Sequence, residues 1–226
     1  MNKIGCLYIV ATPIGNLDDI TLRAIKVLQN ADAVICEEFR QGSTLLKKLN
    51  ISGKELLNLN EHNEEENQVS EILQRLLKGQ NLALVSDCGT PVFADPGHQL
   101  VFEASQFQIP VIPIPGASSL MATLSILDFK LNQFYFAGFL PREKADRAHV
   151  LAGLRNMTVP VVLMDTPYRL GKLLEEAAKT FGKNRRITLA LNLTLENEKI
   201  LRGSFADIIP QINSKKAEFI LVVHNR

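Results

Sequence analysis

Hydrophobic residues in the first half of the chain form short runs separated by longer amphipathic stretches. Five runs, GCLYIVA, AVICE, ELLNLN, LALVS and VIPIP, predict strands at residues 5–11, 33–37, 55–60, 82–86 and 111–115. The stretches between them predict helices near 19–30, 41–49, 65–78 and 98–107, the first with Asp18 or Asp19 as a possible cap. Short apolar strands alternating with amphipathic helices are typical of a parallel sheet covered by helices on both faces.

The second half has a different pattern, with fewer helices between its strands. An apolar stretch at 119–127 predicts a helix, and LPREKADR opens another. Strands are predicted at 134–139, in the first part of 161–169, and at 185–193, 198–204 and 218–225. Because some neighbouring strands lack a crossover helix, antiparallel pairing is expected. We therefore expect two α/β domains, residues 1–113 with a parallel sheet and residues 114–226 with a mixed sheet.

Composition is typical of a globular protein, with 46% hydrophobic and 22% charged residues. No apolar run approaches the roughly 20 residues that a membrane-spanning helix needs. Residues 1–113 contain nine Lys/Arg and fourteen Asp/Glu, whereas residues 114–226 contain sixteen and ten, so their net charges are −5 and +6. A basic second half is compatible with an anionic substrate and also with ordinary surface charge.

The three cysteines, Cys6, Cys36 and Cys88, form no CxxC pair. Their spacing relative to the histidines does not predict a zinc site. An odd number of cysteines without a disulfide pattern is typical of a reducing compartment, and the opening MNKIGCLYIVATPIG indicates a first strand, not a secretory signal. A cytoplasmic location is expected.

Loops rich in Gly, Pro and short polar residues follow each predicted strand of the first half. They are TPIGN, EEFRQG, NEHNEEE, SDCGTPVFADPG and PIPGASS. Parallel sheets bind ligands beyond the carboxyl ends of their strands, so these loops are the predicted site. Neither GxGxxG nor GxxxxGK[ST] occurs, which argues against a dinucleotide fingerprint or a P-loop.

The loop at 86–99 is long for a simple connection, and long loops in compact domains are usually functional. Gly89 and Gly97 permit close approach of the backbone to a ligand, and Asp87 and Asp95 supply carboxylates. The alternative is a loop held by Asx turns around its prolines. Ser118 is likewise either a ligand contact at a helix start or a simple cap.

Taken in order, these loops resemble the tetrapyrrole-methylase superfamily, particularly its ribosomal RNA branch, which methylates a cytidine 2′-hydroxyl of the small-subunit RNA. The matching segments are LYIVATPIGNLDDITLRAI, EHNEE, ALVSDCGTPVFADPG, PVIPIPGASSLMATLS, FAGFLPR and TPYRL. The resemblance implies two α/β domains with S-adenosylmethionine in the cleft between them, a homodimer and no metal. It implies cofactor contacts from Pro13, Gly89, Thr90, Pro91, Phe93, Ser118, Met164 and Ala190. We add Asp87, because a carboxylate suits the amino group of the cofactor.

The chain departs from the ribosomal RNA branch at several places. That branch usually has EDTR-HTR where this chain has EEFRQGS at 37–43, and RELTK where it has LNLTL at 191–195. It also usually continues into a small helical domain beyond the position of VVHNR. Fewer cationic side chains predict weaker phosphate contacts, which dominate RNA affinity. The fold and cofactor expectations do not depend on these segments.

The expected reaction is in-line attack of a substrate oxygen on the sulfonium methyl group, for which the protein supplies alignment and exclusion of water. A ribose hydroxyl needs a base to take its proton, and Glu37, Glu61 and His62 are candidates. Arg40, Arg142 and Arg147 are candidates for holding a phosphate. Two alternatives remain: methylation of a small molecule such as a tetrapyrrole, and a non-catalytic paralogue that binds cofactor or RNA.

Overall fold

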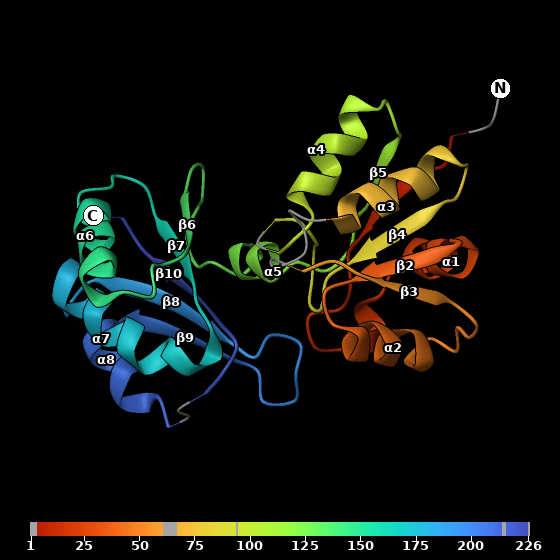
Figure 1. Ribbon diagram of the computed structural model, residues 1–226. Coiled ribbons are helices and arrows are strands. Elements are labelled where there is room, and N and C mark those ends of the chain that lie inside the picture. Colours follow the sequence, from red (N-terminus) through yellow and green to blue (C-terminus); the bar gives the residue numbers. More distant parts are fainter. Residues whose placement is uncertain (1–3, 61–66, 94, 214–215, 226) are drawn as a thin grey trace. The chain divides into compact units, whose positions relative to one another are not determined.

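The computed structural model describes residues 4–60, 67–93, 95–213 and 216–225 (Figure 1). The chain divides into two compact units, Met1–Ser118 and Ser119–Arg226. The division falls after the predicted boundary at 113/114, because the last strand of the first unit continues to Ile114 and the loop that follows is held to this unit by a hydrogen bond from the Thr90 hydroxyl to the Ala117 carbonyl.

The first unit is built on a five-stranded sheet, here called sheet A. All its strands are parallel, in the order β3-β2-β4-β1-β5. This confirms the predicted parallel sheet. The strands are β1 (Leu7–Val10), β2 (Ala33–Cys36), β3 (Glu55–Asn58), β4 (Leu82–Val85) and β5 (Val111–Ile114).

Helices cover both faces of sheet A, because successive strand residues point to opposite faces. In β4, Leu82 and Leu84 pack in one core cluster with α3 (Asn67–Leu77) and α4 (His98–Gln106). Ala83 and Val85 pack in another cluster with α1 (Leu22–Asn30) and α2 (Phe39–Lys48). The near-continuous apolar runs of the sequence therefore reflect strands that are buried on both sides.

The start of α1 differs from the sequence expectation. Asp18 and Asp19 belong to a short 3₁₀ helix, η1 (Leu17–Asp19), for which Asn16 is the cap. The cap of α1 is Thr21, whose side chain accepts a hydrogen bond from the Ala24 amide at 3.1 Å. The prediction of an aspartate cap was wrong because several residues in this stretch can cap a helix, and the chain turns once before α1 begins.

The second unit contains a five-stranded mixed sheet, sheet B, in the order β6-β7-β10-β8-β9. Its first two strands pair in parallel and the remaining pairs are antiparallel, which confirms the predicted mixed sheet. The strands are β6 (Tyr135–Phe139), β7 (Val161–Met164), β8 (Arg186–Leu191), β9 (Lys199–Ser204) and β10 (Phe219–Val223).

Sheet B also has helices on both faces. One core cluster joins it to α6 (Lys144–Leu154), α7 (Leu170–Phe181) and α8 (Phe205–Ile208). On the other face, α5 (Ser119–Ser125) packs through Leu120 against Val162, Ile220 and Val222. Two short 3₁₀ helices, η2 (Pro167–Arg169) and η3 (Ile209–Gln211), complete the unit. No helix in the described part of the chain has the length and apolar character needed to cross a membrane.

Candidate functional site

The middle of sheet A is where a ligand is expected on topological grounds. Strands β1 and β4 lie side by side. The helix after β1 packs on one face of the sheet, and the helix after β4 packs on the other. The two loops therefore leave neighbouring strands in opposite directions, and such divergence opens a crevice at the carboxyl edge of a parallel sheet.

A cavity of about 220 Å³ lies at this place. It is lined by the loop after β1, by the start of the loop after β4, and by one side of α2. Two residues of the predicted cofactor set, Pro13 and Asp87, are among its lining residues. Cofactor pockets commonly measure about 300 Å³ or more, so this cavity suits one end of such a molecule.

Hydrogen bonds fasten the loops after β1 and β4 to each other. The amide of Thr12 donates to the Gly89 carbonyl at 2.8 Å, and the Thr12 hydroxyl donates to the Ser86 carbonyl at 3.1 Å. The hydroxyl of Ser86 donates to the Gly89 carbonyl at 3.0 Å. A third loop joins them, because the Thr90 hydroxyl donates to the Ala117 carbonyl at 3.2 Å. Three loops that are distant in sequence thus form one rigid rim.

The backbone of this rim adopts conformations that few residues accept. Gly89 has φ of +84°, and a Cβ atom there would lie 3.2 Å from Cγ2 of Ile14. Val92 has φ of +71°, which is rare and costly for a β-branched residue. Backbone strain of this kind persists only where surrounding structure imposes it, and it is concentrated at functional sites.

Acidic side chains of Glu38, Asp87 and Asp95 interact electrostatically at this edge. The pKa of Asp87 is raised by partial burial of the Asp87 carboxyl group and by the nearby charge of Glu38. Burial, with the charge of Asp87, raises the pKa of Asp95. Burial and the same two neighbours, Asp87 and Glu38, raise the pKa of the Cys36 thiol to about 11, so this cysteine stays protonated. A bound cation would relieve the repulsion among these carboxylates.

We expect Gly89→Ala to weaken binding of the demethylated cofactor, S-adenosylhomocysteine, by at least about tenfold. Positive φ costs a residue with Cβ about 1–2 kcal/mol, and relief of that strain would shift the rim against Ile14. Titration calorimetry measures the affinity. Gly53→Ala is the matched control, because Gly53 has φ of +71° and a Cβ atom added there would have no neighbour within 4 Å. Equal affinity of the Gly89 variant and the control would contradict the prediction.

In the second unit, the structure brings Met164 and Ala190 together. Both pair with Ile220, one from β7 and the other from β8, so they flank it on the same face of sheet B. Helix α5, which directly follows Ser118, packs on this face. Met164 is half-buried, whereas Ala190 is fully buried. Their contact with the cofactor stays a prediction.

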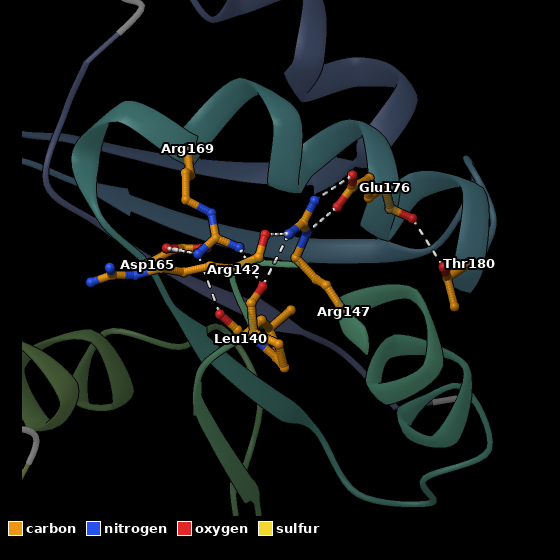
Figure 2. Close-up of polar contacts among 8 residues, drawn as sticks. Leu140, Arg142, Arg147, Asp165, Arg169, Glu176 and Thr180 are labelled. Carbon is orange, nitrogen blue, oxygen red and sulfur yellow. Dashed lines mark hydrogen bonds and ion pairs between the residues drawn. The ribbon is translucent and has the colours of Figure 1, made fainter. Parts of the chain in front are cut away.

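Arg147 lies in the core of the second unit with only 1% of its surface exposed. Its guanidinium forms a bidentate pair with Glu176, at 2.6 and 3.0 Å, and also donates to the carbonyls of Pro141 and Arg142. Figure 2 shows Arg147 pointing toward Glu176. The hydrogen-bonded pairing lowers the pKa of the Glu176 carboxyl. In this arrangement Arg147 holds the protein's own backbone and is too deeply buried to contact a phosphate, so it is not among the proposed substrate contacts.

A second arginine extends the same network (Figure 2). Arg169 donates to the carbonyls of Leu140 and Pro141 and pairs with Asp165 at 3.1 Å. The other carboxylate oxygen of Asp165, Oδ2, is buried and has no hydrogen-bond partner within the described residues. Burial raises the pKa of Asp165 despite the hydrogen bond from the Thr166 amide. The network therefore anchors the segment 140–142 to the end of β7.

The other predicted residues are more accessible. Arg142 is exposed at the end of the anchored segment, and Arg40 is exposed in the first turn of α2. Glu37 is half-buried, and its backbone carbonyl accepts a hydrogen bond from Asn58. Glu61 and His62 lie outside the described residues. In the loop after β4, Pro91 is buried, whereas Thr90 and Phe93 are exposed.

Sequence reasoning missed the network around Asp165, Arg169 and Glu176. Asp165 and Arg169 stand four positions apart in MDTPYR, a spacing that permits pairing. No comparable signal exists for Arg147 and Glu176, which are 29 positions apart. Within the described residues, no group of three or more His, Cys, Asp or Glu side chains is arranged to hold a metal ion.

Comparison with known proteins identifies the family to which this chain belongs. The profile of the family Tetrapyrrole (Corrin/Porphyrin) Methylases matches residues 6–209, which includes both sheets up to β9. The chain belongs to this family. It is a methyltransferase, and S-adenosylmethionine is its methyl donor, as the loop motifs predicted.

The chain is similar to two named sequence relatives and to one solved structure. The chain is 39% identical over 224 residues to "Ribosomal RNA small subunit methyltransferase I" of Neisseria meningitidis serogroup A, with 97% of this chain and 76% of that protein covered. It is 38% identical over 221 residues to the protein of the same name from Halalkalibacterium halodurans, covering 97% and 75%. The solved structure of a cobalamin biosynthetic enzyme, cobalt precorrin-4 methyltransferase, superposes with a TM-score of 0.68 at 19% identity, covering 96% and 94%. At 19% identity, the similarity to this solved structure establishes a shared fold only.

The residues at the edge of sheet A fit this cofactor. S-adenosylmethionine carries positive charge on its sulfonium and its ammonium groups, and the edge presents carboxylates whose pKa values are raised by burial and by one another. Asp87 and Pro13 both line the cavity. A cationic ligand end placed there would remain close to the fastened loops of Thr12 and Gly89.

Proposed function

We propose that this methyltransferase modifies small-subunit ribosomal RNA, at the 2′-hydroxyl of a cytidine. The observation that carries the proposal is 39% identity, over 97% of this chain, to a protein named for that RNA. The second support is electrostatic: residues 114–226 have a net charge of +6, which favours a polyanionic substrate.

The proposed chemistry assigns separate tasks to the residues of the chain. Bound S-adenosylmethionine supplies an electrophilic methyl group. Asp87 holds the α-ammonium group of this donor near Pro13 and the rim of Gly89. Thr90, Pro91, Phe93, Ser118, Met164 and Ala190 remain proposed contacts to the same molecule. Alignment of the acceptor oxygen with the methyl group, in a site that excludes water, is the main source of rate enhancement.

The acceptor hydroxyl loses its proton during the transfer, so a base within hydrogen-bonding distance is required. Glu37 remains a candidate in the described part of the chain, and Glu61 and His62 remain candidates outside it. Arg40 and Arg142 are the proposed phosphate contacts, because both are exposed. Arg142 also belongs to the segment 140–142, whose backbone carbonyls accept hydrogen bonds from Arg147 and Arg169. We further propose a cytoplasmic location, where ribosomal subunits are found, and a homodimer.

The proposal is tested with purified full-length protein, cofactor labelled in its methyl group, and small ribosomal subunits from cells in which the gene has been deleted. We expect label in ribosomal RNA and its recovery, after alkaline hydrolysis, in a dinucleotide that contains cytidine, because a 2′-O-methyl group blocks cleavage. Subunits from the undeleted strain are the control and should accept little label.

Label in the RNA bases would overturn the 2′-hydroxyl assignment and leave RNA as the substrate. Absence of label from all RNA, with the cofactor still bound in calorimetry, would overturn the RNA assignment. A parallel reaction with a tetrapyrrole acceptor then distinguishes a small-molecule enzyme from a paralogue without methyl transfer.

A further inference from the structure

A second, larger cavity lies in the second unit, at the end of sheet B where β8 begins and β10 ends. Its volume is about 770 Å³, and its lining includes Arg186 and His224. Met164 and Ala190 pair with Ile220 near the start of β10, whereas Val161 and Ile187 pair with Val223 at its end. The cavity is therefore at the opposite end of the sheet from the predicted cofactor contacts. We call it the Lys183 pocket.

The Lys183 pocket is strongly cationic. Lys183, Arg185 and Arg186 line it within four consecutive positions of the sequence. Asp128 is the one carboxylate among its described lining residues, and it pairs with Arg186 at 3.2 Å. Lys183 and Arg186 are exposed, so both can reach a ligand that approaches from solvent. The excess of positive charge suits an anion with more than one negative group.

The fold holds these cations in place. Helix α7 ends at Phe181, and Gly182, with φ of +99°, turns the chain. The amide of Arg185 donates to the Gly182 carbonyl at 3.0 Å, which closes the turn. The Arg185 guanidinium donates to the His224 carbonyl at 3.3 Å, which ties the turn to the end of β10. The turn that carries Lys183 and Arg186 is therefore fixed in place by Arg185, so an anion that binds here does not have to order the backbone of this segment.

Ring surfaces lie beside the cations. The rings of Phe129 and His224 have centroids 4.6 Å apart, and the Thr188 hydroxyl lies 3.0 Å from Nε2 of the histidine. Burial lowers the pKa of His224, so its ring is neutral at pH 7. Cations next to aromatic rings form the combination that binds nucleotides, with charge for the phosphate and ring faces for the base.

We propose that the Lys183 pocket binds the phosphodiester backbone of the RNA substrate at a distance from the reacting nucleotide. This inference rests on the proposed function, because it takes the substrate to be RNA. It assigns Lys183 and Arg186 to direct phosphate contacts and Arg185 to positioning of the turn.

The test compares the Lys183→Gln/Arg186→Gln variant of the full chain with wild type on small ribosomal subunits over a range of KCl concentrations. We expect KM for the subunits to rise about tenfold at moderate salt, with kcat changed less than about twofold. The slope of log KM against log salt should fall by about 1.4, because each lost contact to single-stranded RNA removes about 0.7. Affinity for S-adenosylhomocysteine should not change.

The matched control is Lys26→Gln/Lys78→Gln, which removes the same charge from exposed positions of the first unit. It should leave both KM and the slope unchanged, and melting temperatures establish that both variants are folded. A second measurement does not need turnover: fluorescence anisotropy of a labelled small-subunit RNA fragment, without cofactor, should show the same loss of affinity in the pocket variant alone.

The outcomes separate the two proposals. If wild type methylates RNA and the pocket variant keeps its KM, slope and RNA affinity, the pocket assignment is overturned and the proposed function stands. If wild type labels no RNA yet binds the fragment more tightly than the pocket variant does, the proposed function fails and the pocket remains an RNA site. A variant that loses affinity for inorganic phosphate but not for RNA overturns the pocket assignment.

Discussion

Replacement of Arg147 by methionine is expected to lower the free energy of unfolding of the second unit by about 3–5 kcal/mol. The guanidinium is 1% exposed and satisfies both oxygens of Glu176 together with the carbonyls of Pro141 and Arg142. Methionine fills a similar volume but leaves a largely buried carboxylate without its counter-charge. Urea unfolding followed by circular dichroism measures the loss, and hydrogen exchange of peptides from each unit locates it.

The double variant Arg147→Met/Glu176→Leu is the control. It removes the orphaned charge, so it should recover part of the loss. The Arg142 carbonyl still loses its donor, whereas the Pro141 carbonyl keeps the hydrogen bond from Arg169. A loss below about 1 kcal/mol in the single variant would contradict the structural role. Full stability combined with a raised KM for RNA would instead restore Arg147 to the substrate contacts that its sequence position suggested.

Asp87→Asn is expected to weaken binding of S-adenosylhomocysteine by about ten- to a hundredfold, since a hydrogen bond to a charged group contributes about 1.5–3 kcal/mol. The α-ammonium group, which both forms of the cofactor carry, is the partner that loses this interaction. Titration calorimetry measures the affinity. Asp19→Asn, which changes an exposed carboxylate in η1, is the control and should bind as wild type does. Unchanged affinity of the Asp87 variant would remove the electrostatic basis of the cofactor site.

The same substitution is expected to stabilise the protein without ligand at neutral pH. The pKa of Asp87 is raised in the folded protein, by partial burial and by Glu38, so ionisation is less favourable there than in the unfolded chain. Stability is therefore lost as pH rises from the ordinary carboxyl range through the raised pKa. Thermal unfolding should show the Asn variant above wild type at pH 7 and equal to it at pH 3. A site that binds a cation gives up stability for function in this way.

Local patterning determined much of this protein. The runs at 5–11 and 82–86 predicted buried parallel strands because alternate residues of such strands pack against helices on both faces, as Leu84 and Val85 do. The Gly- and Pro-rich loops predicted the ligand-binding edge because they follow the carboxyl ends of those strands. The loop motifs predicted the family and the cofactor because each motif is a contiguous segment that can be recognised in the sequence without knowledge of the fold.

The tertiary structure decided what depends on distant partners. The sequence marks Arg147 as a cation that could hold a phosphate, and only the packing of α6 against α7 places Glu176 beside it, 29 positions away. The crevice at β1 and β4 exists because the helices after these strands cover opposite faces, which the strand order determines together with the right-handedness of the crossover connections. The cations of the Lys183 pocket are adjacent in sequence, but their tie to β10 requires the folded sheet. The periodicity of hydrophobic residues indicates which face of a helix or strand is buried. Which side chains then pair between different helices and strands depends on the free energy of the assembled core.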